Sequence, residues 1–117
     1  MRPVIAALVA LLWSGAAGAH AFLDRAVPPV GATVAAAPAE IRLFFTEPVE
    51  PAFSGIALAT ADGKPVAAGR AAVDPGDPRQ LVLPLPPLPP GRYRVSWHVV
   101  SVDTHRTEGD YTFSVNP

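Results

Sequence analysis

The stretch RYRVSWHVVSVDTHRTEGDYTFSV, residues 92–115, holds two alternating segments separated by a polar one. In residues 92–99, and again in residues 110–115, every second side chain is apolar or aromatic. A period of two is typical of β-strands that bury one face. The stretch therefore predicts two strands joined by a loop. Their buried side chains would be Tyr93, Val95, Trp97 and Val99 in the first strand and Tyr111, Phe113 and Val115 in the second.

The rest of the chain after residue 20 extends this β pattern. Residues 40–46, EIRLFFT, alternate in the same way, and weaker strands are expected at 21–26, 55–61, 65–73 and 80–85. Turn signals rich in Pro, Gly and Asp separate these segments, and the 15 prolines disfavour a helical bundle. About seven short strands predict an all-β fold, a single β-sandwich of immunoglobulin-like architecture.

Length, charge and cysteine content limit the classes of function. A chain of 117 residues is the size of one domain, and its formal net charge of −1 gives no basic surface for nucleic acid. The absence of Cys excludes disulfides, thiolate metal ligands and thiol nucleophiles. The sequence also shows no Ser-His-Asp set, phosphate loop or pair of catalytic carboxylates.

Residues 1–19, MRPVIAALVALLWSGAAGA, have the composition of a secretory signal peptide. Arg2 supplies the positive start, an apolar run follows, and Ala17-Gly18-Ala19 provides small residues before a cleavage site. The apolar run is short for a membrane span. We therefore expect an exported protein with a signal peptide at 1–19 and a single domain at 20–117.

The position of cleavage decides whether a histidine becomes the N-terminus. A cut after Ala19 makes His20 the first residue. Ala19-His20-Ala21 also satisfies the rule of small residues, and a cut there would leave Phe22 first. Both cuts are compatible with the sequence.

Three residues together suggest a copper site. Asp103 and His105 are two positions apart, a spacing that lets a carboxylate and an imidazole reach one ion, although a solvated loop has the same pattern. An N-terminal His20 would add its α-amine and its ring Nδ1. Three nitrogens and one oxygen favour a tetragonal ion, Cu(II) before Zn(II). Because the amine must lose its proton to bind, affinity should fall in acid.

Two other residues are weaker candidates. His98 has the opposite parity to Trp97, so we expect it on the exposed face of its strand without a role in metal binding. Glu47 follows the strand at 40–46 and would either support the metal site or be an ordinary charge at a strand end. Cu(I) prefers sulfur ligands, which the chain after residue 19 lacks.

The segments HAFLDRAVPPVGATV, IRLFFTEPV and YRVSWHVVSVDTHRTEGDYTFSV resemble the CopC family of periplasmic copper-binding proteins. The similarity spans nearly the whole chain after residue 19. It implies a Greek-key β-sandwich in the periplasm, Cu(II) as the bound ion, and His20, Asp103 and His105 as ligands. It also implies that Glu47 lies near the copper, as a second-shell residue or weak ligand.

The resemblance also bears on the type of copper and on partners. Some family members hold Cu(I) in a Met-rich loop, but the matching region here has no Met, which implies a Cu(II)-only protein. The family often works beside a CopD-type inner-membrane protein, an implied partner here. A frequent Asp-Gly-His-Pro of the family is Asp103-Thr104-His105-Arg106 in this chain, so the ligand positions remain and the turn chemistry changes.

The expected function is therefore a non-enzymatic Cu(II) carrier or buffer in copper homeostasis or resistance. One alternative is a copper oxidative enzyme, because polysaccharide monooxygenases also use an N-terminal histidine on a β-sandwich. Here Asp103 would fill a metal position that such an enzyme leaves open for oxygen. A second alternative is a metal-free β-sandwich interaction module, which would follow if cleavage removed His20.

Overall fold

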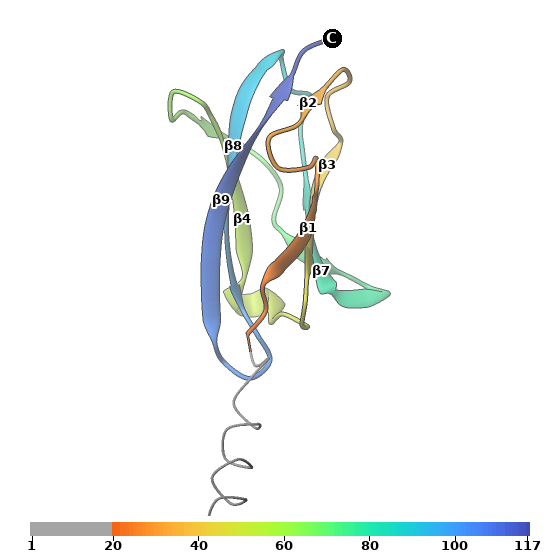
Figure 1. Ribbon diagram of the computed structural model, residues 1–117, viewed down its shortest axis with the longest axis vertical. Coiled ribbons are helices and arrows are strands. Elements are labelled where there is room, and N and C mark those ends of the chain that lie inside the picture. The colour runs from red at the N-terminus through yellow and green to blue at the C-terminus, as the bar shows by residue number, and fades with distance from the viewer. Residues whose placement is uncertain (1–19) are drawn as a thin grey trace, which may run out of the picture.

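Two β-sheets face each other in the computed structural model, which describes residues 20–117 (Figure 1). One sheet has the strand order β1-β3-β7-β6 and the other the order β2-β9-β8-β4-β5. The strands are β1 Leu23–Val27, β2 Thr33–Val34, β3 Glu40–Phe45, β4 Gly55–Thr60, β5 Pro65–Val66, β6 Ala72–Asp74, β7 Asp77–Pro84, β8 Gly91–Val100 and β9 Arg106–Val115, with one 3-10 turn, η1, at Pro51–Phe53. This architecture confirms the predicted all-β sandwich.

The central element is the long antiparallel pair β8–β9. Its register runs without a break from Gly91 opposite Val115 to Val100 opposite Arg106. The buried residues fall at alternate positions of both strands, as the sequence predicted, although Trp97 is only half-buried. Because β9 begins only six residues after the last residue of β8, residues 101–105 form a tight connection between them. This connection lies at the end of the sandwich opposite the C-terminus (Figure 1).

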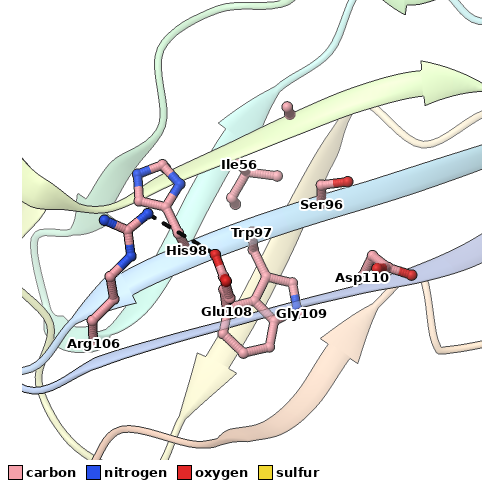
Figure 2. A pocket seen from close by; sticks show the side chains of 10 residues that line it. Ile56, Ser96, Trp97, His98, Arg106, Glu108, Gly109 and Asp110 are labelled. Carbon is pink, nitrogen blue, oxygen red and sulfur yellow. Dashed lines mark ion pairs between the residues drawn. The ribbon is translucent and has the colours of Figure 1, made fainter. Parts of the chain in front are cut away.

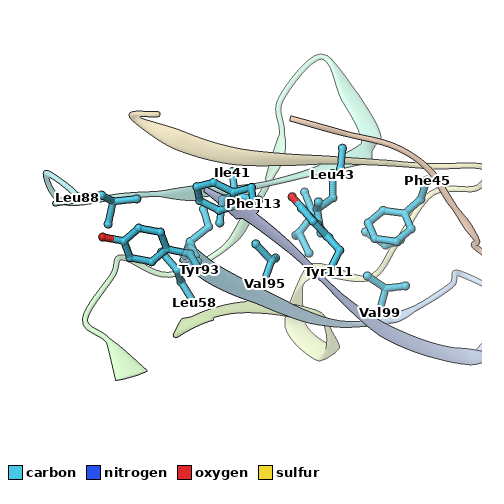
Figure 3. Close-up of a cluster of buried hydrophobic side chains, with 14 of the residues drawn as sticks. Ile41, Leu43, Phe45, Leu58, Leu88, Tyr93, Val95, Val99, Tyr111 and Phe113 are labelled. Atoms are coloured by element: carbon cyan, nitrogen blue, oxygen red, sulfur yellow. The ribbon is translucent and has the colours of Figure 1, made fainter. Parts of the chain in front are cut away.

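The core lies between the sheets and is made of aliphatic and aromatic side chains (Figure 3). Tyr93 stacks on Phe113 with ring centroids 5.6 Å apart, and Trp97 meets Phe45 edge-on at 5.2 Å. Tyr111 is 6% exposed, and burial raises the pKa of its hydroxyl to about 12. Within residues 20–117 this hydroxyl has no hydrogen-bond partner, so Tyr111 contributes to the core through the packing of its aromatic ring.

The structure departs from the predicted strands in two places. The strand expected at 65–73 is interrupted: only Pro65–Val66 and Ala72–Asp74 are strands, and they belong to different sheets. The strand β2 was not predicted, because two residues are too few to show alternation. It is defined by its parallel pairing with Ser114 and Val115 of β9. The described part of the chain contains no helix long and apolar enough to cross a membrane.

Candidate metal centre

The segment His20-Ala21-Phe22 leads into β1 and is hydrogen-bonded on two sides. Phe22 donates its N–H to the hydroxyl of Thr46 at 3.0 Å, and Thr46 donates its own N–H to the Phe22 carbonyl at 2.9 Å. From the other sheet, the Thr107 hydroxyl donates to the Ala21 carbonyl at 2.7 Å. Ala21 is fully buried. We call residues 20–22 the N-terminal arm, and these bonds set the position of His20.

The loop between β8 and β9 is closed by its own backbone. Ser101 donates its N–H to the His105 carbonyl at 2.9 Å, and Thr104 donates to the Ser101 carbonyl at 2.9 Å. Thr104 has φ of 72°, a left-handed conformation that a β-branched residue rarely adopts. The loop therefore turns sharply at Thr104, and Asp103 and His105 lie close together on either side of it.

Asp103 joins the buried and exposed parts of this loop. One carboxylate oxygen accepts from the hydroxyl of Ser101, which is 1% exposed, and the other lies 3.0 Å from Nδ1 of His105. The Ser101 hydrogen bond, followed by that of His105, holds the pKa of Asp103 below its ordinary value. Asp103 is therefore a carboxylate at neutral pH, and its contact with Nδ1 leaves Nε2 of His105 open.

The arm brings His20 against His105 across the end of the sandwich. The two imidazole rings are stacked with centroids 4.3 Å apart and an interplanar angle of 21°, and Phe22 stacks on the far side of His20 at 5.8 Å. His105 therefore contacts both other predicted ligands. Asp103 belongs to the same loop, whereas His20 comes from a segment more than 80 positions away in the chain. Its side chain is 50% exposed and that of Asp103 is 36% exposed.

This arrangement is close to a metal site without having its final geometry. Among residues 20–117, no three His, Asp or Glu side chains converge in the manner of a ligand set. Parallel rings are in van der Waals contact, whereas two imidazoles on one ion point their nitrogens at it. The donors still fit Cu(II) by type, because both imidazoles and the carboxylate lie at one accessible end.

His98 lies away from this end, on the outer face of the five-stranded sheet. It lines a groove of about 560 Å³ together with Ser96 and Glu108 (Figure 2). The predicted face is correct, but the ring is half-buried rather than exposed. It lies flat over Gly55, where an added Cβ would be 2.9 Å from Cε1 of His98. His98 therefore packs on the sheet, and among the described residues it makes no ring contact with His20 or His105.

Glu47 follows Thr46 directly and lies two residues beyond the end of β3. Its side chain is half-buried, and among the described residues it makes no ion pair or side-chain hydrogen bond. The structure thus places Glu47 next to the residue that holds the arm, and within residues 20–117 it has no hydrogen bond or ion pair with a histidine. Its predicted supporting role stays a prediction.

Three residues that support this site were not found from the sequence. Thr46 and Thr107 hold the arm through their hydroxyl groups, and no spacing pattern distinguishes them from other threonines in strands. Ser101 is close to Asp103 in the sequence, but its burial and its hydrogen bond depend on the folded loop. The predicted cleavage after Ala19 involves residues outside the described part of the chain.

The fold is a small β-sandwich, and one of its ends brings together two imidazoles and a carboxylate. Comparison with known proteins identifies the family: residues 23–116 match the CopC domain, and the chain belongs to the CopC family. Relatives from Escherichia coli and Pseudomonas syringae pv. tomato, 44% and 39% identical, are named copper resistance protein C, so copper is the metal associated with this family.

Individual relatives agree with this assignment. Protein YobA of Escherichia coli K12 is 42% identical over 116 residues, covering 98% of this chain and 94% of YobA. The crystal structure of CopC from Methylosinus trichosporium OB3b matches with a TM-score of 0.79 and 42% identity, covering 84% of this chain and 95% of that one. PcoC, a methionine-rich copper resistance protein from Escherichia coli, matches with a TM-score of 0.73 and 42% identity, covering 84% and 100%.

Proposed function

We propose that this protein is a periplasmic, non-enzymatic Cu(II) carrier or buffer whose metal site forms when residues 1–19 are removed. The observation that carries the proposal is the contact of His105 with both His20 and Asp103 at one end of the sandwich. Cleavage after Ala19 would turn the backbone nitrogen of His20 from an amide into a free amine. The donor set would then be that amine, the ring of His20, Nε2 of His105 and a carboxylate oxygen of Asp103.

The hydrogen bonds around the site support this division of roles. Because Asp103 accepts from Nδ1 of His105, it favours the tautomer in which Nε2 has a lone pair for the metal. Each carboxylate oxygen has a second lone pair, so Asp103 can meet the ion while it keeps these contacts. Glu47, which follows Thr46, is proposed to support the site from outside the set of direct ligands or to act as a weak ligand.

The composition supports a preference for Cu(II). The chain has no Cys, and its one Met is Met1, within the proposed signal peptide. The relative PcoC is described as methionine-rich, so the two proteins differ in the sulfur ligands that Cu(I) needs. A site with four nitrogen and oxygen donors holds Cu(II) and leaves little room for a substrate at the metal. We infer storage or delivery of copper, with a CopD-type inner-membrane protein as the partner.

The test is an intact mass measurement of the protein secreted into its native compartment, with and without one equivalent of Cu(II). We expect a chain that starts at His20 and retains one copper ion. A chain that starts at Phe22 would lack two of the four donors, and that result would reject the proposed site.

A further inference from the structure

We propose that Thr107 is a positioning residue that holds the N-terminal histidine against His105 and thereby sets the affinity for Cu(II). This inference rests on the proposed copper site. Thr107 itself offers no ligand in that site. Its hydroxyl is occupied by the Ala21 carbonyl, at 2.7 Å.

The hydrogen bond between Thr107 and Ala21 lies close to both histidines in the chain. Thr107 lies two residues after His105, and Ala21 lies one residue after His20. The bond thus joins a residue next to His20 with a residue two positions after His105, although its partners are 86 positions apart in the chain. Thr107 is opposite Val99 in the register of β8 and β9, on the face that points between the sheets. Its side chain therefore points toward the arm.

The bonds of Thr46 cannot replace this contact. Thr46 follows β3, and it holds Phe22 through two hydrogen bonds of 3.0 and 2.9 Å, with a longer contact of 3.4 Å to the His20 carbonyl. These contacts fasten the arm to the four-stranded sheet. His105 precedes β9 in the other sheet, and Thr107 supplies the hydrogen bond from β9 to the arm. Loss of the Thr107 hydroxyl should therefore loosen the arm relative to His105.

Loss of the Thr107 hydroxyl should lower Cu(II) affinity because the site would be less pre-organised. A chelate made from two distant chain segments is tighter when both segments are already held in place, because less conformational freedom is lost on binding. Ala21 is fully buried, so without Thr107 its carbonyl would lose its partner in a place that water does not reach. The arm would then move outward to hydrate that carbonyl and carry His20 away from His105.

The test compares three variants in a Cu(II) competition titration of the processed protein. Thr107→Val keeps the β-branched shape and removes the hydroxyl, and we expect affinity to fall about tenfold. Thr107→Ser keeps the hydroxyl and should restore most of the affinity. Thr112→Val is the matched control on the same strand, because the side chain of Thr112 makes no hydrogen bond within the described chain. It should leave affinity unchanged.

A double-mutant cycle separates positioning from a general effect on the fold. In a His105→Ala background there is no longer a second imidazole to align, so Thr107→Val should change affinity less than about twofold. The same tenfold loss in that background would overturn the positioning role. If His105→Ala alone weakens binding but Thr107→Val does not, only the inference fails. If His105→Ala also has no effect, the proposed copper site fails with it.

Discussion

Two regions of this protein place a histidine near a carboxylate, and they differ in what holds the histidine. At the end of the sandwich, His105 is bonded to Asp103 and stacked on His20. In the groove of the five-stranded sheet, His98 and Glu108 face each other in the register of β8 and β9, but the His98 ring leans over Gly55 on the opposite side (Figure 2). The proximity of a histidine to an acidic residue is thus a poor criterion, by itself, for a metal site. Among the described residues, the ring of His105 lies within hydrogen-bond distance of its neighbouring carboxylate, and the ring of His98 does not.

We expect His105→Ala to have the largest effect on Cu(II) binding. The substitution removes the imidazole that contacts both other proposed ligands, so we expect Cu(II) affinity to fall roughly a hundredfold or more while the fold remains. His105 is half-exposed and outside the core, which is why stability should change little. A competition titration and a thermal unfolding curve check the two parts, and affinity close to the unmodified protein would refute the assignment.

Asp103→Asn should have a smaller effect, about a tenfold loss of Cu(II) affinity. Asn keeps the shape of the side chain but loses the charge that neutralises the ion. Since hydrogen bonds lower the pKa of Asp103, its carboxylate form persists below the usual value, and its contribution is lost only as the pH falls through that lowered pKa. Between pH 5 and pH 8, titration of Asp103 should therefore not change the ratio of the Cu(II) affinities of the two proteins. A ratio near one would remove Asp103 from the ligand set.

His98→Ala should have the smallest effect, a change in Cu(II) affinity below about twofold. The ring packs on Gly55 and belongs to the outer face of the sheet, separate from the N-terminal arm. The same competition titration measures it. A loss equal to that of His105→Ala would mean that the groove, rather than the end of the sandwich, binds the metal.

The sequence was informative where a local rule governs the structure. The alternation in residues 92–115 predicted the buried face of β8 and β9, because a strand repeats its orientation every two residues. The contact between Asp103 and His105 also follows from short spacing. Both features depend on few residues that are neighbours in the chain.

The features that could not be predicted from the sequence depend on contacts between segments that are distant in the chain. The strand β2 exists because Thr33 and Val34 pair with the end of β9. Residues 65–73 divide because their first part pairs with β4 in one sheet and their last part pairs with β7 in the other. The hydroxyl of Thr107 finds the carbonyl of Ala21 only after both sheets have closed. The sequence therefore identified candidate ligands but could not identify the residues that bring them together.

The contact between Trp97 and Phe45 also has a spectroscopic consequence. The chain has two tryptophans, and Trp13 belongs to the proposed signal peptide, so the processed protein would have a single indole. That indole lies across Gly109, where a Cβ would be 2.7 Å from its Cζ2, and edge-on to Phe45, the residue before Thr46. Its fluorescence would come from one defined environment near the arm. A paramagnetic Cu(II) ion at His20 should quench it, which would give a direct optical signal for loading and release without any added label.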